Sequence, residues 1–99
     1  MIEQSTAQID QIKSQLNTAF APSWLELQDQ SDRHRHHPGR KQAPAGSGHY
    51  DLVIVSEQFE SKTLIQRHRL IYSVLADQIP SQIHALTIRA YTPAEWRDL

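Results

Sequence analysis

The chain has 99 residues, with ten basic and eleven acidic side chains and a formal net charge of −1. This length favours one domain with a modest core, and the near-neutral charge gives no general attraction to nucleic acid. Because the chain contains no cysteine, the sequence excludes intrachain disulfides, a cysteine nucleophile and an iron–sulfur cluster bound only through its own thiolates.

The first quarter of the chain predicts a helix followed by a strand. Apolar side chains recur at three- and four-residue steps between residues 5 and 20, which indicates an amphipathic helix that Pro22 ends. Its expected inner side chains are Ile9, Ile12, Leu16 and Phe20. Residues 24–28 alternate between apolar and polar side chains, which is typical of a strand with one buried face.

A long polar segment follows, from about residue 30 to residue 48. It contains two prolines and three glycines and no large apolar side chain, so it cannot build a core. We expect a flexible loop, because a loop of this length in a small domain is usually functional or disordered. It carries four of the ten basic residues and half of the six histidines, namely His34, His36 and His37.

The second half predicts strand, helix, strand and short helix. Residues 50–56 contain a continuous apolar run, which favours a central strand. Residues 61–78 form the expected second helix and residues 84–91 the third strand. The sequence from Thr92 to Glu95 has the form of a capping box that opens a last helix.

The order α-β-β-α-β-α predicts a single α+β domain over residues 1–99, with a three-stranded mixed sheet and helices on one face. The strand–helix–strand crossover should make the second and third strands parallel. Parallel strands begin at the same end of a sheet, so His49 and His84 should converge there with the end of the long loop.

The loop histidines have two interpretations. In the first, the segment is a solvated basic loop. In the second, one histidine is a metal ligand, and the neighbouring arginines would favour an anionic target over a free divalent cation. A thiolate-ligated [2Fe–2S] cluster is such a target, since imidazole replaces thiolate on one iron in Rieske centres.

Several blocks occur in a fixed order along the chain. They are Gln66-Arg67-His68-Arg69-Leu70-Ile71-Tyr72, Ile83-His84-Ala85-Leu86-Thr87-Ile88 and Tyr91-Thr92-Pro93-Ala94-Glu95-Trp96, preceded by Pro44-Ala45-Gly46-Ser47, His49-Tyr50, Val55-Ser56 and Phe59. In this order and spacing the chain resembles the BolA-like family over roughly residues 5–97, and within it the class whose first loop supplies a histidine.

The resemblance implies a fold similar to the second type of K-homology domain and a heterodimer with a monothiol glutaredoxin around a shared [2Fe–2S] cluster. The partner would supply a cysteine and a bound glutathione. This chain would supply His84 and one loop histidine, His34, with His36 and His37 as alternates. We expect His49 to lie in the second shell of that site, and we expect no cluster to be held stably by this chain alone.

The Arg-His-Arg helix also has two interpretations. Its cations can form an ordinary solvated face, with His68 on the inner stripe of Leu64, Ile71 and Leu75. Alternatively, they contact DNA or a partner protein, as the transcriptional role of some BolA-like proteins implies. The candidate contact residues are Lys62, Arg67 and Arg69.

We therefore expect a non-enzymatic protein of iron–sulfur cluster trafficking or of iron and redox regulation. The alternative is a DNA-binding transcriptional regulator of morphology and stress genes, and a weak homodimer is a further alternative. No nucleophile–base set or nucleotide-binding motif is present. The first twelve residues lack arginine and include two acidic side chains, which is unlike a targeting peptide, and no apolar run could cross a membrane. We expect a cytoplasmic protein.

Overall fold

The computed structural model describes residues 2–29, 49–79, 83 and 85–99. The elements in chain order are helix α1 (Ile2–Phe20), strand β1 (Trp24–Asp29), strand β2 (His49–Val55), the 3-10 turn η1 (Glu57–Phe59), helix α3 (Leu64–Val74), the 3-10 turn η2 (Ala76–Gln78), strand β3 (Ala85–Tyr91) and helix α4 (Pro93–Arg97). The predicted loop of about residues 30–48 lies outside the described residues.

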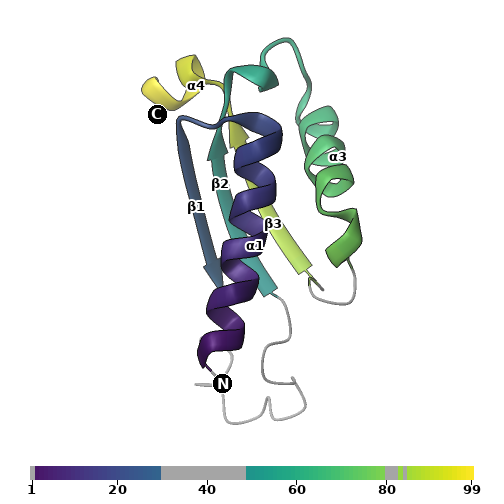
Figure 1. Ribbon diagram of the computed structural model, residues 1–99. Coiled ribbons are helices and arrows are strands. Elements are labelled where there is room, and N and C mark those ends of the chain that lie inside the picture. The colour runs from purple at the N-terminus through teal and green to yellow at the C-terminus, as the bar shows by residue number, and fades with distance from the viewer. Residues whose placement is uncertain (1, 30–48, 80–82, 84) are drawn as a thin grey trace, which may run out of the picture.

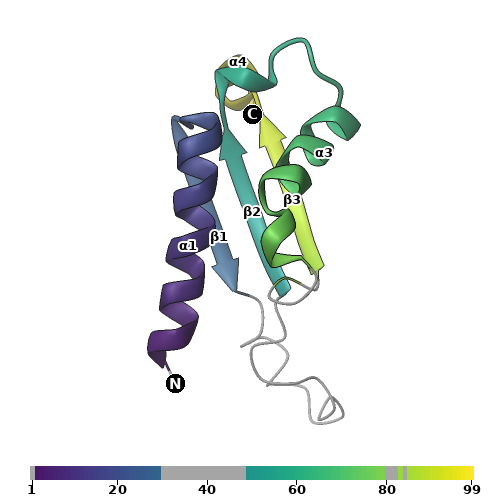
Figure 2. The ribbon, with the colours of Figure 1, turned by 45° about the vertical axis from the view of Figure 1, so that its right-hand side comes forward.

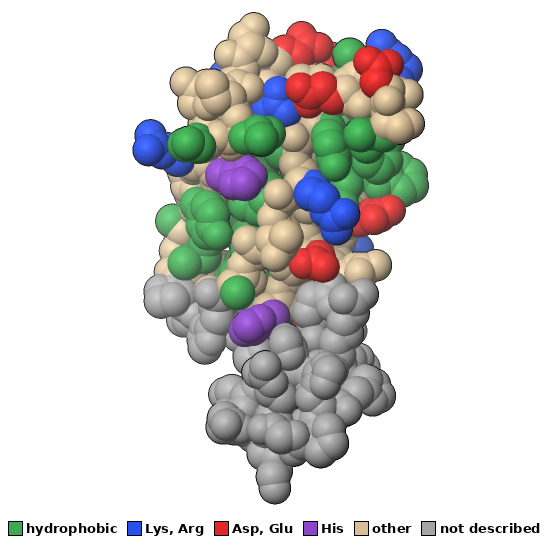
Figure 3. All heavy atoms as spheres, turned by 180° about the vertical axis from the view of Figure 1, so that it is seen from behind, with side chains coloured by type: hydrophobic (Ala, Val, Ile, Leu, Met, Phe, Trp, Pro, Cys, Tyr) green, Lys and Arg blue, Asp and Glu red, His purple; other side chains and the backbone are tan. Residues whose placement is uncertain are grey.

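The described strands form one sheet in the order β1-β2-β3. β1 pairs with β2 antiparallel and β2 pairs with β3 parallel, so the expected mixed sheet is confirmed. Helices α1 and α3 lie on the same face of the sheet (Figures 1 and 2). The opposite face, seen in Figure 3, is covered by neither of these two helices.

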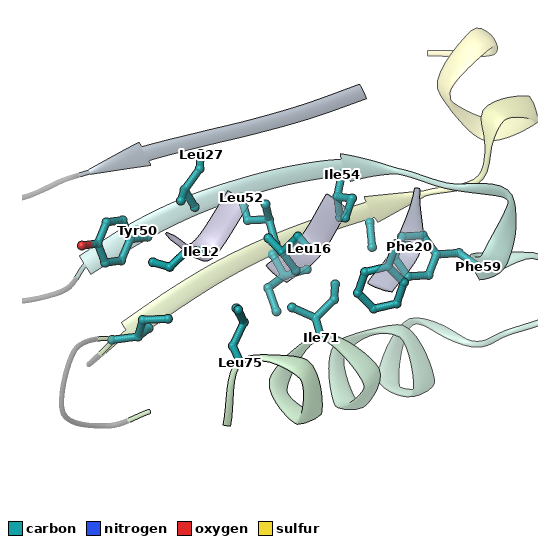
Figure 4. Close-up of a cluster of buried hydrophobic side chains, with 13 residues drawn as sticks. Ile12, Leu16, Phe20, Leu27, Tyr50, Leu52, Ile54, Phe59, Ile71 and Leu75 are labelled. Carbon is teal, nitrogen blue, oxygen red and sulfur yellow. The ribbon is translucent and has the colours of Figure 1, made fainter. Parts of the chain in front are cut away.

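The core lies between this sheet and the two helices (Figure 4). Strand side chains alternate between its two faces, so β2 contributes Leu52 and Ile54 while α1 contributes Ile12 and Leu16, all fully buried. The predicted apolar stripe of the first helix is confirmed. The helix itself begins at Ile2, three residues before the predicted start.

The second helix is shorter than predicted. Thr63 caps α3, because its side chain accepts from the Gln66 N–H and the Gln66 side chain accepts from the Thr63 N–H. The chain reaches this cap through Ser61, which has a left-handed backbone with φ of 68°. The capping box fixes the start of the helix two residues after Lys62.

An aromatic group forms where β3 ends. The rings of Trp24 and Trp96 are 6.1 Å apart, and those of Tyr91 and Trp96 are 5.5 Å apart. Trp24 and Tyr91 are the register partners of Val55 on either side, so the aromatic group lies at one end of the sheet. Trp24 and Tyr91 therefore pack outside the main core cluster, and Tyr91 contacts Trp96 of α4. The predicted capping box of Thr92 and Glu95 is also present.

Candidate functional site

The candidate site lies at the end of the sheet where β2 and β3 both begin. His49 is the first residue of β2, and its register partner in β3 is Ala85. Ala85 follows His84 directly in the sequence. The sheet therefore brings the histidine at the start of β2 beside the residue that follows the predicted ligand, although the two are far apart in the chain.

The residues on both sides of His84 are firmly placed. Ile83 is almost fully buried in the core, and its N–H donates to the carbonyl oxygen of Gln78 at 2.9 Å. On the other side, Ala85 begins β3 and pairs with β2. His84 itself lies outside the described residues.

The loop histidines His34, His36 and His37 also lie outside the described residues, so the ligand assignments stay predictions. Within the described part of the chain, no group of three or more histidine, cysteine, aspartate or glutamate side chains could hold a metal ion. His49 is half-buried there and is engaged in an interaction with its surroundings. Imidazole is an established ligand for one iron of a [2Fe–2S] centre.

A polar network supports the chain just before the site. The amide nitrogen of Gln15 in α1 donates to the Val74 carbonyl at 3.1 Å and to Asp77 Oδ1 at 3.0 Å. The amide nitrogen of Gln78 donates to the amide oxygen of Gln15. Since Gln78 also accepts from Ile83 through its backbone, this network connects α1 to the start of the segment that contains His84.

One atom of this network is unsatisfied. The side chain of Gln78 is buried, and its Oε1 has no hydrogen-bond donor among the described residues. Sequence reasoning missed the network, because polar residues near a helix end normally face solvent.

A second buried polar group near this end is Tyr50, the register partner of Asp29. Its side chain contributes to the core (Figure 4). Burial, and to a smaller extent the negative charge of Asp29, raise the pKa of Tyr50 above its ordinary value. The phenol therefore stays neutral at physiological pH and acts as part of the core.

Arg67 is not a surface contact, and the prediction that it binds DNA or a partner is wrong. Its side chain is buried, and its guanidinium donates to the Ala90 carbonyl at 2.9 Å and to the Lys62 carbonyl at 3.1 Å. Nη1 and Nη2 donate to the two carboxylate oxygens of Glu95 at 2.8 and 3.1 Å. The guanidinium also lies 6.0 Å from the centre of the Phe59 ring.

The other two candidate cations remain on the surface. Lys62 and Arg69 are exposed, and together with Ser61, Gln66 and Leu70 they line a shallow hollow beside α3. The structure therefore separates the two arginines of the Arg-His-Arg sequence into one structural and one accessible residue. His68 between them is half-buried.

Comparison with known proteins decides the family. The family described as "BolA-like protein" matches residues 16–95 of this chain. The chain belongs to the BolA-like family.

Two curated relatives support this assignment. The BolA-like chain is 40% identical over 91 residues to the "DNA-binding transcriptional regulator BolA" of Escherichia coli K12, an alignment that covers 91% of this chain and 80% of that protein. It is 39% identical over 88 residues to "BolA-like protein 1" of Mus musculus, where the alignment covers 88% of this chain and 59% of the mouse protein. The chain thus spans less than two thirds of the mouse relative.

The fold agrees with solved structures of the family. The BolA domain of SufE1 from Arabidopsis thaliana has a TM-score of 0.73 and 42% sequence identity, and the match covers 86% of this chain and 91% of that domain. The BolA-like arrangement of sheet and helices described above is therefore shared. No described helix is both long enough and apolar enough to span a bilayer.

Proposed function

We propose that this BolA-like protein pairs with a monothiol glutaredoxin and shares a [2Fe–2S] cluster with it, with a role in cluster trafficking or in iron and redox regulation. The observation that supports the proposal best is the parallel register of β2 and β3, in which His49 is the partner of Ala85. That register fixes the residue next to His84 at the end of the sheet where the long loop returns to β2.

The ligands that this chain can offer are complementary to those of such a partner. The chain has six histidines and no cysteine, so it can supply imidazole but no thiolate. Each iron of a [2Fe–2S] cluster has two terminal ligands, and in a Rieske-type site one iron takes imidazoles while the other takes thiolates. In the proposed complex, His84 and His34 bind iron, with His36 and His37 as alternates for His34. The glutaredoxin cysteine and glutathione provide the thiolates.

His49 has a different role in this proposal. It is fixed by the sheet at the first position of β2, beside the start of β3. Outer groups of this kind orient the ligands of a metal site and tune their basicity. We place His49 in this second shell, where it orients the start of β3 and the returning loop.

Reconstitution tests the proposal directly. The chain is mixed with a monothiol glutaredoxin, ferrous iron, sulfide and glutathione, and the visible absorption and circular dichroism of the purified 1:1 complex are recorded. We expect spectra that differ from those of the glutaredoxin's own cluster. Spectra identical to those of the glutaredoxin alone, or a stoichiometric cluster on this chain in the absence of a partner, would contradict the proposal.

A second candidate function is DNA binding, as the name of the Escherichia coli relative suggests. Two exposed cations, Lys62 and Arg69, support it, whereas Arg67 is buried and cannot take part. Phosphate contacts by two cations would give a weak affinity with only a modest dependence on salt concentration. Fluorescence anisotropy with duplex DNA over a range of salt concentrations, for the wild type and for a Lys62→Ala and Arg69→Ala double variant, measures this contribution.

A further inference from the structure

Helix α3 is held to the rest of the molecule at both ends. Near its start, Arg67 connects it to the Ala90 carbonyl of β3 and to Glu95 of α4. At its end, the amide of Gln15 on α1 donates to the Val74 carbonyl. A helix restrained in this way presents its outer face in one orientation, which lowers the entropic cost of binding.

The outer face of α3 is apolar and basic. Ile65 has 63% of its surface exposed and Leu70 has 36%, although exposed helix faces usually carry charged side chains of both signs. Helix α3 contains no aspartate or glutamate, and its exposed charged residue is Arg69. We call Lys62, Ile65, Gln66, Arg69 and Leu70 the α3 outer face.

A hollow of about 430 Å³ lies in this face, lined by Ser61, Lys62, Gln66, Arg69 and Leu70. Lys62 and Arg69 have no acidic partner among the described residues, so both remain available to an incoming anion. The amide oxygen of Gln66 is already used by the Thr63 N–H, which leaves its amide nitrogen as a donor. Leu70 adds an apolar side chain beside the hydrogen-bond donors of Lys62, Gln66 and Arg69.

We propose that the α3 outer face is the docking surface for a short acidic segment of a partner protein that carries aliphatic side chains between its carboxylates. The carboxylates pair with Lys62 and Arg69, and the aliphatic groups cover Ile65 and Leu70. Charge complementarity selects an acidic partner. The exposed apolar area selects a polypeptide over nucleic acid, because a phosphate backbone has no aliphatic groups with which to bury Ile65.

This docking surface requires no cluster and can be tested without one. The isotope-labelled chain is titrated with a synthetic peptide of alternating glutamate and leucine, and backbone amide shifts are followed by NMR. We expect saturable shifts centred on Ile65, Arg69 and Leu70. The same peptide with lysine in place of glutamate should give none, and a short DNA duplex at the same concentration should shift Ile65 and Leu70 little.

Single substitutions test the charged and the apolar contacts of the α3 outer face one at a time. Arg69→Glu should weaken binding of the acidic peptide about tenfold, since it replaces an attraction by a repulsion. Arg89→Glu is the matched control, because Arg89 is exposed on β3 and the change in net charge is the same. Arg89→Glu should leave the affinity within about twofold of wild type.

Ile65→Ser should also weaken binding, by about fivefold. Leu64→Ser is its control, because Leu64 is equally exposed but lines a different hollow beside Ala90 and Tyr91. The proposal is overturned if the acidic peptide produces no saturable shifts on α3, if both control variants weaken binding as much as their test variants, or if DNA produces the stronger shifts at Ile65 and Leu70.

Discussion

Arg67 and Glu95, which are 28 positions apart in the sequence, form a bidentate ion pair with nitrogen–oxygen distances of 2.8 and 3.1 Å. The pair connects α3 to α4 at the end of the molecule opposite the candidate cluster site. Glu95 also accepts from the Thr92 N–H at 2.9 Å as part of the capping box. One carboxylate therefore both starts α4 and fixes its position on α3.

Replacing the arginine should destabilise the protein. Arg67→Met keeps an apolar stem but removes the donors to Glu95, Ala90 and Lys62, so we expect a loss of about 2 kcal/mol in the free energy of unfolding. Urea denaturation followed by circular dichroism measures this loss. Arg69→Met is the control, and it should change stability by less than about 0.5 kcal/mol because Arg69 is exposed. Equal effects of the two variants would contradict the structural role of Arg67.

The same pair predicts an acid dependence of stability. Hydrogen bonding from Arg67, followed by that from the Thr92 backbone, lowers the pKa of Glu95 from 4.5 to about 2. A carboxyl whose pKa is lower in the folded state stabilises the fold at pH values above its unfolded pKa, and this contribution disappears as the pH falls through the folded pKa. The contribution of Glu95 should therefore be full above about pH 5 and decline between pH 4.5 and about 2.

Glu95→Gln isolates this effect, because glutamine keeps the acceptor for the Thr92 N–H and removes the charge. We expect the variant to be less stable than wild type by roughly 1 kcal/mol at neutral pH, a modest value because the Glu95 side chain is 48% exposed and solvent screens the pair. The difference should shrink on acidification and vanish near pH 2. A difference that stays constant with pH would show that the charge is unimportant.

Much of the fold could be predicted from the sequence, because its determinants are local or topological. The spacing of Ile12, Leu16 and Phe20 predicts α1, and the strand–helix–strand order predicts the parallel pair of β2 and β3. The position of Arg67 could not be read in the same way. Its buried state depends on Glu95, Ala90 and Phe59, which come from three other elements and meet only in the folded chain.

The sequence does contain a spacing that predicts a buried Arg67, although it conflicts with the inner stripe predicted for this helix. Arg67, Ile71 and Leu75 follow one another at four-residue steps, and all three are buried. Leu64, which was expected on the inner stripe, is 63% exposed. Choosing the inner positions of α3 by hydrophobicity alone therefore selects Leu64 and misses Arg67. An arginine can occupy an inner position when its charge is paired.

The network between Gln15 and Gln78 gives another prediction. Gln15→Ala removes the donor to the Val74 carbonyl and leaves the amide nitrogen of buried Gln78 without its acceptor, so stability should fall by about 1 to 2 kcal/mol. Gln78→Met instead replaces a side chain whose Oε1 is already unpaired, and an apolar group of similar shape should change stability by less than about 1 kcal/mol. Urea denaturation of both variants tests this order. A larger loss for Gln78→Met than for Gln15→Ala would contradict it.

The last prediction concerns the proposed cluster. His84→Ala should reduce the absorbance and shorten the lifetime of the shared cluster more than any single substitution in the loop. Its neighbours Ile83 and Ala85 are fixed by the core and by the sheet, and a ligand between fixed residues is placed more accurately than one on a long loop. We expect a lifetime shorter by at least roughly tenfold in the heterodimer with a monothiol glutaredoxin.

Substitutions in the loop should behave differently, because its histidines can replace one another. His34→Ala alone should shift the spectrum modestly, since His36 and His37 lie within three positions of it. The triple change of His34, His36 and His37 to alanine should approach the effect of His84→Ala. The unfolding free energy of the apo protein serves as the control for all variants, because a fall in stability would give a trivial reason for cluster loss. If His84→Ala keeps the wild-type absorbance and lifetime while the apo protein stays folded, His84 is a structural histidine and the cluster is ligated elsewhere.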